Sequence, residues 1–222
     1  MKKYPVFIAG GTGYIGKRLI RILLDAGCDV TALVRGQSIK KLPRGCKAVI
    51  GSPFDVVSYV GSIPADSVFV HLVGVSHPGP KKKLLFYSVD LVSLKVSVEA
   101  AKQAGVRHFV YVSVVQHPTK VMADYQEARR QGEEAILASG LTSTFIRPWY
   151  VVGPGHYWPI LFQPVFKLLE VIPSTSVQAK ALALVSLKQM LLTLKNTVIN
   201  TPKGINTIVE VLDIKNAKPQ SS

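Results

Sequence analysis

The chain has 222 residues and a formal net charge of +14 at pH 7. This length allows one domain with a substantial core and is too short for two large ones. A hydrophobic content of 48% and a mean hydropathy of +0.27 exclude general disorder and suit a buried sheet. We expect a single domain over residues 1–216, with a lid or substrate region over residues 148–200, and a flexible tail over residues 217–222.

Strands and helices are predicted to alternate along the chain. This alternation indicates right-handed crossovers and a doubly wound, Rossmann-type α/β fold with a parallel sheet. The residues from 215 onward are expected to form a loose tail. The predicted strands are 6–9, 29–34, 48–50, 67–73, 108–113, 142–146 and 206–212, and the predicted helices are 14–26, 83–104, 122–138 and 187–195.

A glycine-rich turn joins the first predicted strand to the first helix. Glycines permit the tight turn and let the backbone approach a pyrophosphate, and the N-terminus of the helix then attracts the anion. In this context the pattern predicts a dinucleotide phosphate site rather than a plain turn. The expected residues of this site are Gly10, Gly11, Thr12, Gly13, Tyr14, Ile15 and Gly16.

Arg35 follows the second predicted strand, where the side chain faces the adenosine ribose. An acid there would bind the 2′-hydroxyl, whereas a guanidinium can hold a 2′-phosphate. We therefore predict NADP(H) in preference to NAD(H); the alternative is that Arg35 is a solvated loop cation. The segment Val30–Phe54 supports the first interpretation, because it contains no acidic residue and several basic ones.

The remaining composition argues against other classes of function. The basic residues are scattered and lie outside any known nucleic-acid motif, so nucleic acid is not expected as the main partner. Cys28 and Cys46 are too few for a disulfide framework, and no secretion signal is recognised, so we expect a cytoplasmic protein with reduced thiols. No metal is expected, because metal-ligand spacing is absent from the five histidines, His71, His77, His108, His117 and His156.

Three segments of the chain resemble the short-chain dehydrogenase/reductase superfamily, in its extended and atypical branch. Within it, the chain is similar to NmrA-like NAD(P)H-binding regulators and to the nucleotide-binding accessory subunit of respiratory complex I. The resemblance covers nearly the whole chain. The segments are Gly10–Gly16, Ala100–Ser113 and Arg147–Gly155.

The resemblance implies a set of catalytic residues. Active members pair a serine at the end of strand five with Tyr-x-x-x-Lys on the next helix, and Ser113 and Tyr125 match the serine and the tyrosine. By analogy, Tyr125 would exchange a proton with a substrate oxygen that Ser113 binds. The expected cofactor site also includes Val73, Pro148 and Val151.

Three positions depart from the family pattern. Arg129 stands at the lysine position, where it would bind the nicotinamide ribose and favour the phenolate of Tyr125. Asp90 replaces an asparagine of the proton relay, and Ser52 stands where many relatives carry an acid near the adenine. The alternative for Tyr125 and Arg129 is an ordinary exposed pair one helical turn apart.

Aromatic residues gather after the sixth predicted strand, where they would line a substrate pocket, contact an anionic membrane surface or pack in the core. They are Trp149, Tyr150, Tyr157, Trp158, Phe162 and Phe166. The leading hypothesis is an NADP(H)-dependent oxidoreductase for a small carbonyl or alcohol, acting as a monomer or homodimer, in the cytoplasm or peripheral at the membrane. The alternative is a non-catalytic NADP(H)-binding redox sensor or assembly protein.

Overall fold

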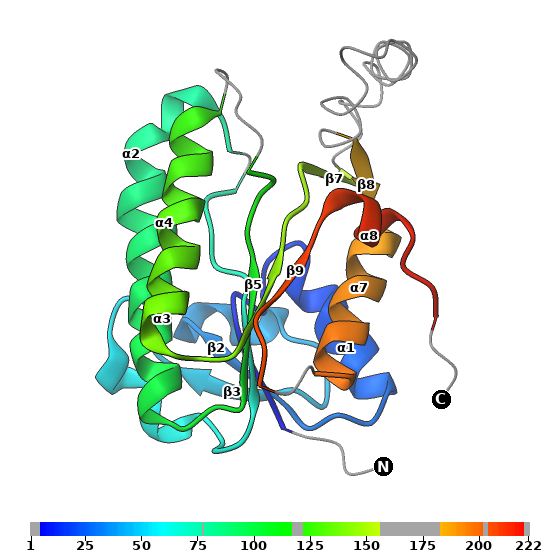
Figure 1. Ribbon diagram of the computed structural model, residues 1–222. Coiled ribbons are helices and arrows are strands. Elements are labelled where there is room, and N and C mark those ends of the chain that lie inside the picture. Colours follow the sequence, from blue (N-terminus) through cyan, green and yellow to red (C-terminus); the bar gives the residue numbers. More distant parts are fainter. Residues whose placement is uncertain (1–4, 77, 117–121, 156–182, 202–203, 220–222) are drawn as a thin grey trace, which may run out of the picture.

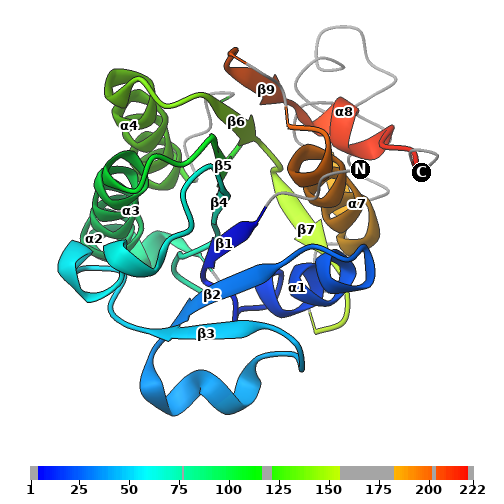
Figure 2. The same ribbon diagram turned by 90° about the horizontal axis from the view of Figure 1, so that it is seen from below.

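The computed structural model describes residues 5–76, 78–116, 122–155, 183–201 and 204–219. Within these residues, a seven-stranded parallel sheet has the order β3-β2-β1-β4-β5-β6-β9 (Figures 1 and 2). The Rossmann-type α/β fold that the alternation predicts is confirmed. The strands of this sheet are β1 (Val6–Ala9), β2 (Val30–Val34), β3 (Lys47–Ile50), β4 (Val68–His71), β5 (His108–Val112), β6 (Ser143–Ile146) and β9 (Thr207–Val209).

Helices cover both faces of the sheet, as Figure 2 shows. One face carries α1 (Gly16–Asp25) and α7 (Leu187–Ile199), and the other carries α3 (Val92–Gln103) and α4 (Ala123–Ser139). Each face has its own cluster of buried apolar side chains. No helix in the described ranges has the length and hydropathy needed to cross a lipid bilayer.

The central strands are buried because helices cover both sides of them. All residues of β1 and β4 are buried, as apolar strands in a parallel sheet require. On the α3 face, three phenylalanines lie side by side in register across β1, β4 and β5. The ring centroids of Phe7 and Phe69 are 5.2 Å apart, and those of Phe69 and Phe109 are 5.0 Å apart. This aromatic row stabilises the middle of the sheet.

The predicted helix over residues 83–104 is interrupted. It begins as α2 (Lys83–Leu85), continues as a π-helical turn over Phe86–Leu91, and becomes α3 only at Val92. A π-helical turn shifts the helical phase, so the side chains of Phe86 and Asp90 are buried beside α4. The sequence spacing suited a continuous helix and gave no sign of this shift.

The C-terminal part differs from the prediction in two places. The strand predicted over residues 206–212 ends at Val209, and α8 (Val211–Lys215) follows it. Glu210 and Asp213 form a capping box that favours this helix start. Lys215 is therefore helical, and the carbonyl oxygen of Lys218 accepts a hydrogen bond of 3.0 Å from the Asn196 side chain on α7.

A second, two-stranded parallel sheet was not predicted. It pairs β7 (Tyr150–Val152) with β8 (Leu184–Ser186), directly before α7. Both strands have only three residues, too few for a recognisable pattern. The sheet fixes Tyr150 and Val151 next to the carboxyl end of the main sheet (Figure 1). The aromatic residues Tyr157, Trp158, Phe162 and Phe166 lie outside the described residues.

Candidate active site

A cavity of about 350 Å³ opens where the strand order reverses between β1 and β4. Ligands of open α/β sheets bind at such a switch point, beyond the carboxyl ends of the strands. Its walls come from the glycine turn, the ends of β4 and β5, α4, and the start of β7. The predicted residues that line it are Gly10, Gly13, Tyr14, Ile15, Gly16, Val73, Ser113, Tyr125, Arg129, Pro148 and Val151.

The glycine turn fits the backbone approach that a dinucleotide needs. Gly10 has a φ of +88°, and a Cβ there would lie 2.6 Å from the carbonyl carbon of Leu72. At Gly16, a Cβ would collide with the carbonyl oxygen of Gly10. Helix α1 begins here without an acidic residue in its first turn, so its N-terminal N–H groups and dipole favour an anion. These residues suit a pyrophosphate.

Arg35, Gly11, Thr12 and Asp90 do not line this cavity. Arg35 is exposed directly after β2, at the start of a 3₁₀ helix (Gly36–Lys41). Ser52 follows β3, and its backbone N–H donates a 3.0 Å hydrogen bond to the Ser58 hydroxyl. Both residues therefore lie at the carboxyl ends of β2 and β3, the two strands on one side of β1, where the adenosine end of a dinucleotide would be placed.

Ser113 lines this cavity directly after the end of β5. Ser113 is 2% exposed, and no residue in the described part of the chain hydrogen-bonds its oxygen. A buried hydroxyl without a partner is costly, so a ligand oxygen is a suitable partner. Tyr125 lines the same cavity from the first turn of α4, and its ring packs edge-on against Phe86 at 5.0 Å between centroids.

Arg129 is buried and ion-paired. Its Nη2 donates a 2.8 Å hydrogen bond to Asp90 Oδ2, with side-chain exposures of 8% for the arginine and 1% for the aspartate. Its Nη1 donates 3.0 Å to the carbonyl oxygen of Val112, and its Cζ lies 5.1 Å from the ring centroid of Tyr125. The alternative of an exposed helix pair is therefore wrong for Arg129.

Arg129 and Asp90 both depart from the family pattern, and the structure shows that they form one ion pair in which the two charges neutralise each other. Burial raises the pKa of Asp90, whereas Arg129 and the N–H of Val75 lower it. Burial lowers the pKa of Arg129, but Tyr111, Tyr125 and Asp90 outweigh burial and raise it above its ordinary value. Burial also raises the pKa of Tyr111 to about 12, although Arg129 opposes this. Arg129 remains charged at every pH at which the protein folds.

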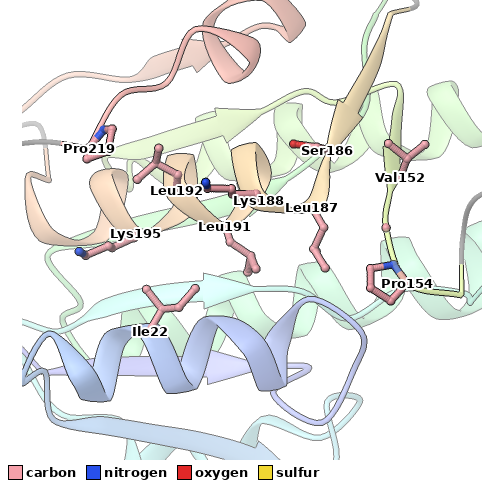
Figure 3. A pocket seen from close by; sticks show the side chains of 11 residues that line it. Ile22, Val152, Pro154, Ser186, Leu187, Lys188, Leu191, Leu192, Lys195 and Pro219 are labelled. Atoms are coloured by element: carbon pink, nitrogen blue, oxygen red, sulfur yellow. The ribbon is translucent and has the colours of Figure 1, made fainter. Parts of the chain in front are cut away.

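A larger cavity of about 630 Å³ lies between α1 and α7, beside the end of β7 (Figure 3). Leu187 and Leu191 point from α7 toward Ile22 on α1, and Lys188 and Lys195 supply its charges. Among the described residues that line it there is neither a carboxylate nor a phenol, whereas the smaller cavity is lined by Tyr125.

Comparison with known proteins agrees with this geometry. The pattern of a family described as NAD(P)H-binding matches residues 10–157, more than half of the chain. The chain belongs to the NAD(P)H-binding family. The match begins at Gly10 and includes the glycine turn, Ser113, Tyr125 and Arg129.

Curated proteins with different descriptions are similar to the chain. A ceramide reductase of Caulobacter vibrioides is 28% identical over 178 residues, which cover 77% of this chain and 55% of the reductase. A photosystem II assembly factor of Cyanophora paradoxa is 25% identical over 144 residues, which cover 64% of this chain and 44% of that protein. The NAD(P)H-binding chain thus spans about half the length of these relatives.

Solved structures confirm the fold class. A UDP-glucose 4-epimerase of Thermus thermophilus in complex with NAD superposes with a TM-score of 0.69 and 17% identity, over 95% of this chain and 81% of the epimerase. At this identity the likeness concerns the fold alone. Together with the family match, it confirms the resemblance to the short-chain dehydrogenase/reductase superfamily.

Proposed function

We propose that this NAD(P)H-binding protein is an NADP(H)-dependent oxidoreductase acting on a carbonyl or alcohol carbon. The observation that carries the proposal is the buried hydroxyl of Ser113, which has no hydrogen-bond partner among the described residues and belongs to a residue that lines the same cavity as Tyr125 and the glycine turn. A hydroxyl and a phenol beside a dinucleotide site are the groups that a carbonyl oxygen requires for binding and proton transfer.

The residues around the cavity divide the work between binding and proton transfer. When bound, the cofactor supplies the hydride. The glycine turn and the start of α1 would hold its pyrophosphate, and Val73, Pro148 and Val151 would contact its nicotinamide half. Ser113 would donate a hydrogen bond to the substrate oxygen. In the reductive direction Tyr125 would donate its phenolic proton to that oxygen, and in the oxidative direction it would accept the proton.

Preference for NADP(H) is supported by the charge around the end of β2. Arg35 is exposed at the expected 2′-phosphate position, and Lys40 and Lys41 end the 3₁₀ helix that follows it. Such a cluster provides charge-assisted hydrogen bonds and a positive field for the extra phosphate.

A second candidate function is NADP(H) binding without turnover, as in a redox sensor or an assembly protein. The ion pair between Arg129 and Asp90 favours it, because the charge beside Tyr125 is neutralised and cannot move as a lysine would. The sequence similarity to the photosystem II assembly factor of Cyanophora paradoxa also supports this second function.

Cofactor titration combined with turnover distinguishes the two candidates. Purified protein would be titrated with NADPH and NADH by fluorescence, and NADPH consumption followed with a panel of aldehydes, ketones and quinones. Tight NADPH binding with consumption supports the oxidoreductase. Tight binding without consumption across the panel overturns it in favour of the binding protein, and no binding of either dinucleotide overturns both.

A further inference from the structure

The buried pair of Asp90 and Arg129 connects two strand ends that line the cavity. Asp90 Oδ1 accepts a 2.7 Å hydrogen bond from the N–H of Val75, in the loop after β4. Arg129 Nη1 donates to the carbonyl oxygen of Val112, the last residue of β5. The pair therefore joins the loop after β4 to the end of β5.

The loop is shaped to lie against this pair. A Cβ at Gly74 would be 2.7 Å from Nη2 of Arg129 and 3.5 Å from Oδ2 of Asp90. Gly74 has no positive φ, so its lack of a side chain serves the close approach rather than a turn. Gly74, Val75 and Arg129 line the cavity, whereas Asp90 does not.

The position of Asp90 depends on the π-helical turn. This turn buries Asp90 at 1% exposure, where an aspartate is unfavourable unless it is paired. π-helical turns are frequent at functional sites because they redirect one or two side chains. Here the redirected side chains contact Arg129 and Tyr125.

We propose that Asp90 and Arg129 act as one pair of positioning residues, which holds the Gly74–Val75 wall of the cavity and thereby sets the affinity for NADP(H). The effect on NADP(H) rests on the proposed function, whereas the effect on the wall does not. Removing either charge leaves the other buried and unpaired, so the two residues are expected to be replaceable only together.

The chain offers a matched control on the same helix. Glu133 lies one turn after Arg129, is 5% exposed and pairs with Arg147 at 2.5 Å. This second pair is also largely buried, with side-chain exposures of 16% for Arg147 and 6% for Glu133, and Arg147 pairs with Glu210 as well. Neither Glu133 nor Arg147 lines the cavity. Asp90→Asn and Glu133→Gln therefore make the same chemical change, and only the first reaches the wall.

Hydrogen exchange in the absence of ligand tests the wall directly. We expect Asp90→Asn to accelerate exchange in peptides covering Leu72 to Ser76 by roughly tenfold, and Glu133→Gln to leave it unchanged. Equal acceleration in both variants, or in neither, would overturn the proposal. In the unmodified protein, the Val75 amide is expected to exchange more slowly than the Gly74 and Ser76 amides, which decides the matter if Asp90→Asn does not fold.

Cofactor affinity tests the consequence. Asp90→Asn and Arg129→Gln are each expected to weaken NADPH binding roughly tenfold, and the double variant no more than either single variant. Glu133→Gln should lower the Tm while keeping the NADPH affinity. Additive losses in the double variant contradict a single acting pair. If the unmodified protein binds no NADPH, the proposed function fails. The hydrogen-exchange result still shows whether Asp90 and Arg129 hold the Gly74–Val75 wall.

Discussion

A Cβ added to Gly10 would lie 2.6 Å from the carbonyl carbon of Leu72 and 2.8 Å from the backbone nitrogen of Val73. The turn after β1 thus packs directly against the chain leaving β4. Only glycine permits both this approach and the φ of +88° at Gly10.

Gly10→Ala is accordingly expected to weaken NADPH binding at least tenfold and to lower the free energy of unfolding, because backbone atoms on one side must move. Gly140→Ala is the control, since Gly140 has a φ of +79° but nothing within 4 Å of the added Cβ. It should cost about 1–2 kcal/mol of stability and leave NADPH binding intact. Fluorescence titration and urea unfolding measure the two effects.

Arg35→Ala is expected to reduce NADPH affinity by about 10- to 100-fold and to leave NADH affinity almost unchanged, because the lost hydrogen bonds involve only the 2′-phosphate. Lys41→Ala, at the end of the same 3₁₀ helix, should have a smaller effect that salt screens. Equal losses for NADPH and NADH would show that Arg35 does not recognise the 2′-phosphate.

Tyr125→Phe is expected to abolish NADPH-dependent turnover while NADPH still binds, since the phenol supplies only the proton. Ser113→Ala should lower kcat about 100-fold, because it removes the hydrogen bond that Ser113 would donate to the substrate oxygen. Tyr87→Phe, a change on the π-helical turn outside the cavity lining, serves as the control. Retained activity in Tyr125→Phe would eliminate its proposed role.

Two buried histidines predict a loss of stability in acid. Burial, with help from the charge of Arg129, lowers the pKa of His71 from 6.5 to about 3. Burial, with help from Arg107, lowers that of His108 to about 4. Both are held neutral by the fold, His71 beside Ser97 and His108 beside Thr144. Below pH 6.5 the unfolded chain therefore binds more protons than the folded one, and folding becomes less favourable as the pH falls.

The contribution of these two histidines to the free energy of unfolding is expected to be constant above about pH 7. Below pH 6.5 the free energy of unfolding should fall, by up to about 1.4 kcal/mol per pH unit for each histidine. Urea unfolding at pH 7.5, 6 and 5 measures this. The variant His71→Gln should show a shallower decline than the unmodified protein. An identical decline would assign the acid sensitivity to other groups.

Much of the fold could be predicted because the central strands are mostly apolar and α1, α4 and α7 keep a helical spacing of apolar residues over ten residues or more. The strand-turn-helix at Gly10 and the C-cap glycines at Gly105 and Gly140, with φ of +64° and +79°, are local signals that do not depend on distant residues. β7 and β8 could not be predicted in this way. Each has three residues, and they become strands only by pairing with each other.

In the candidate site, too, some residues could be predicted from local motifs and others depend on contacts between distant parts of the chain. Ser113, Tyr125 and the glycines were placed by local motifs, and all except Gly11 line one cavity. Arg129 and Asp90 each departed from the family pattern, but their relation could not be seen in the sequence. They are 39 positions apart, and only the π-helical turn and the packing of α4 bring their charges to 2.8 Å.

The short sheet of β7 and β8 has a consequence for synthesis on the ribosome. Strands β1 to β5 are complete once Val112 has been made, yet the cavity wall at Tyr150 and Val151 depends on β8 at Leu184–Ser186. We therefore expect a nascent chain that ends before β8 to lack the β7 part of this cavity wall. NADPH binding to stalled chains of increasing length would rise abruptly once β8 has left the exit tunnel, rather than gradually as strands are added.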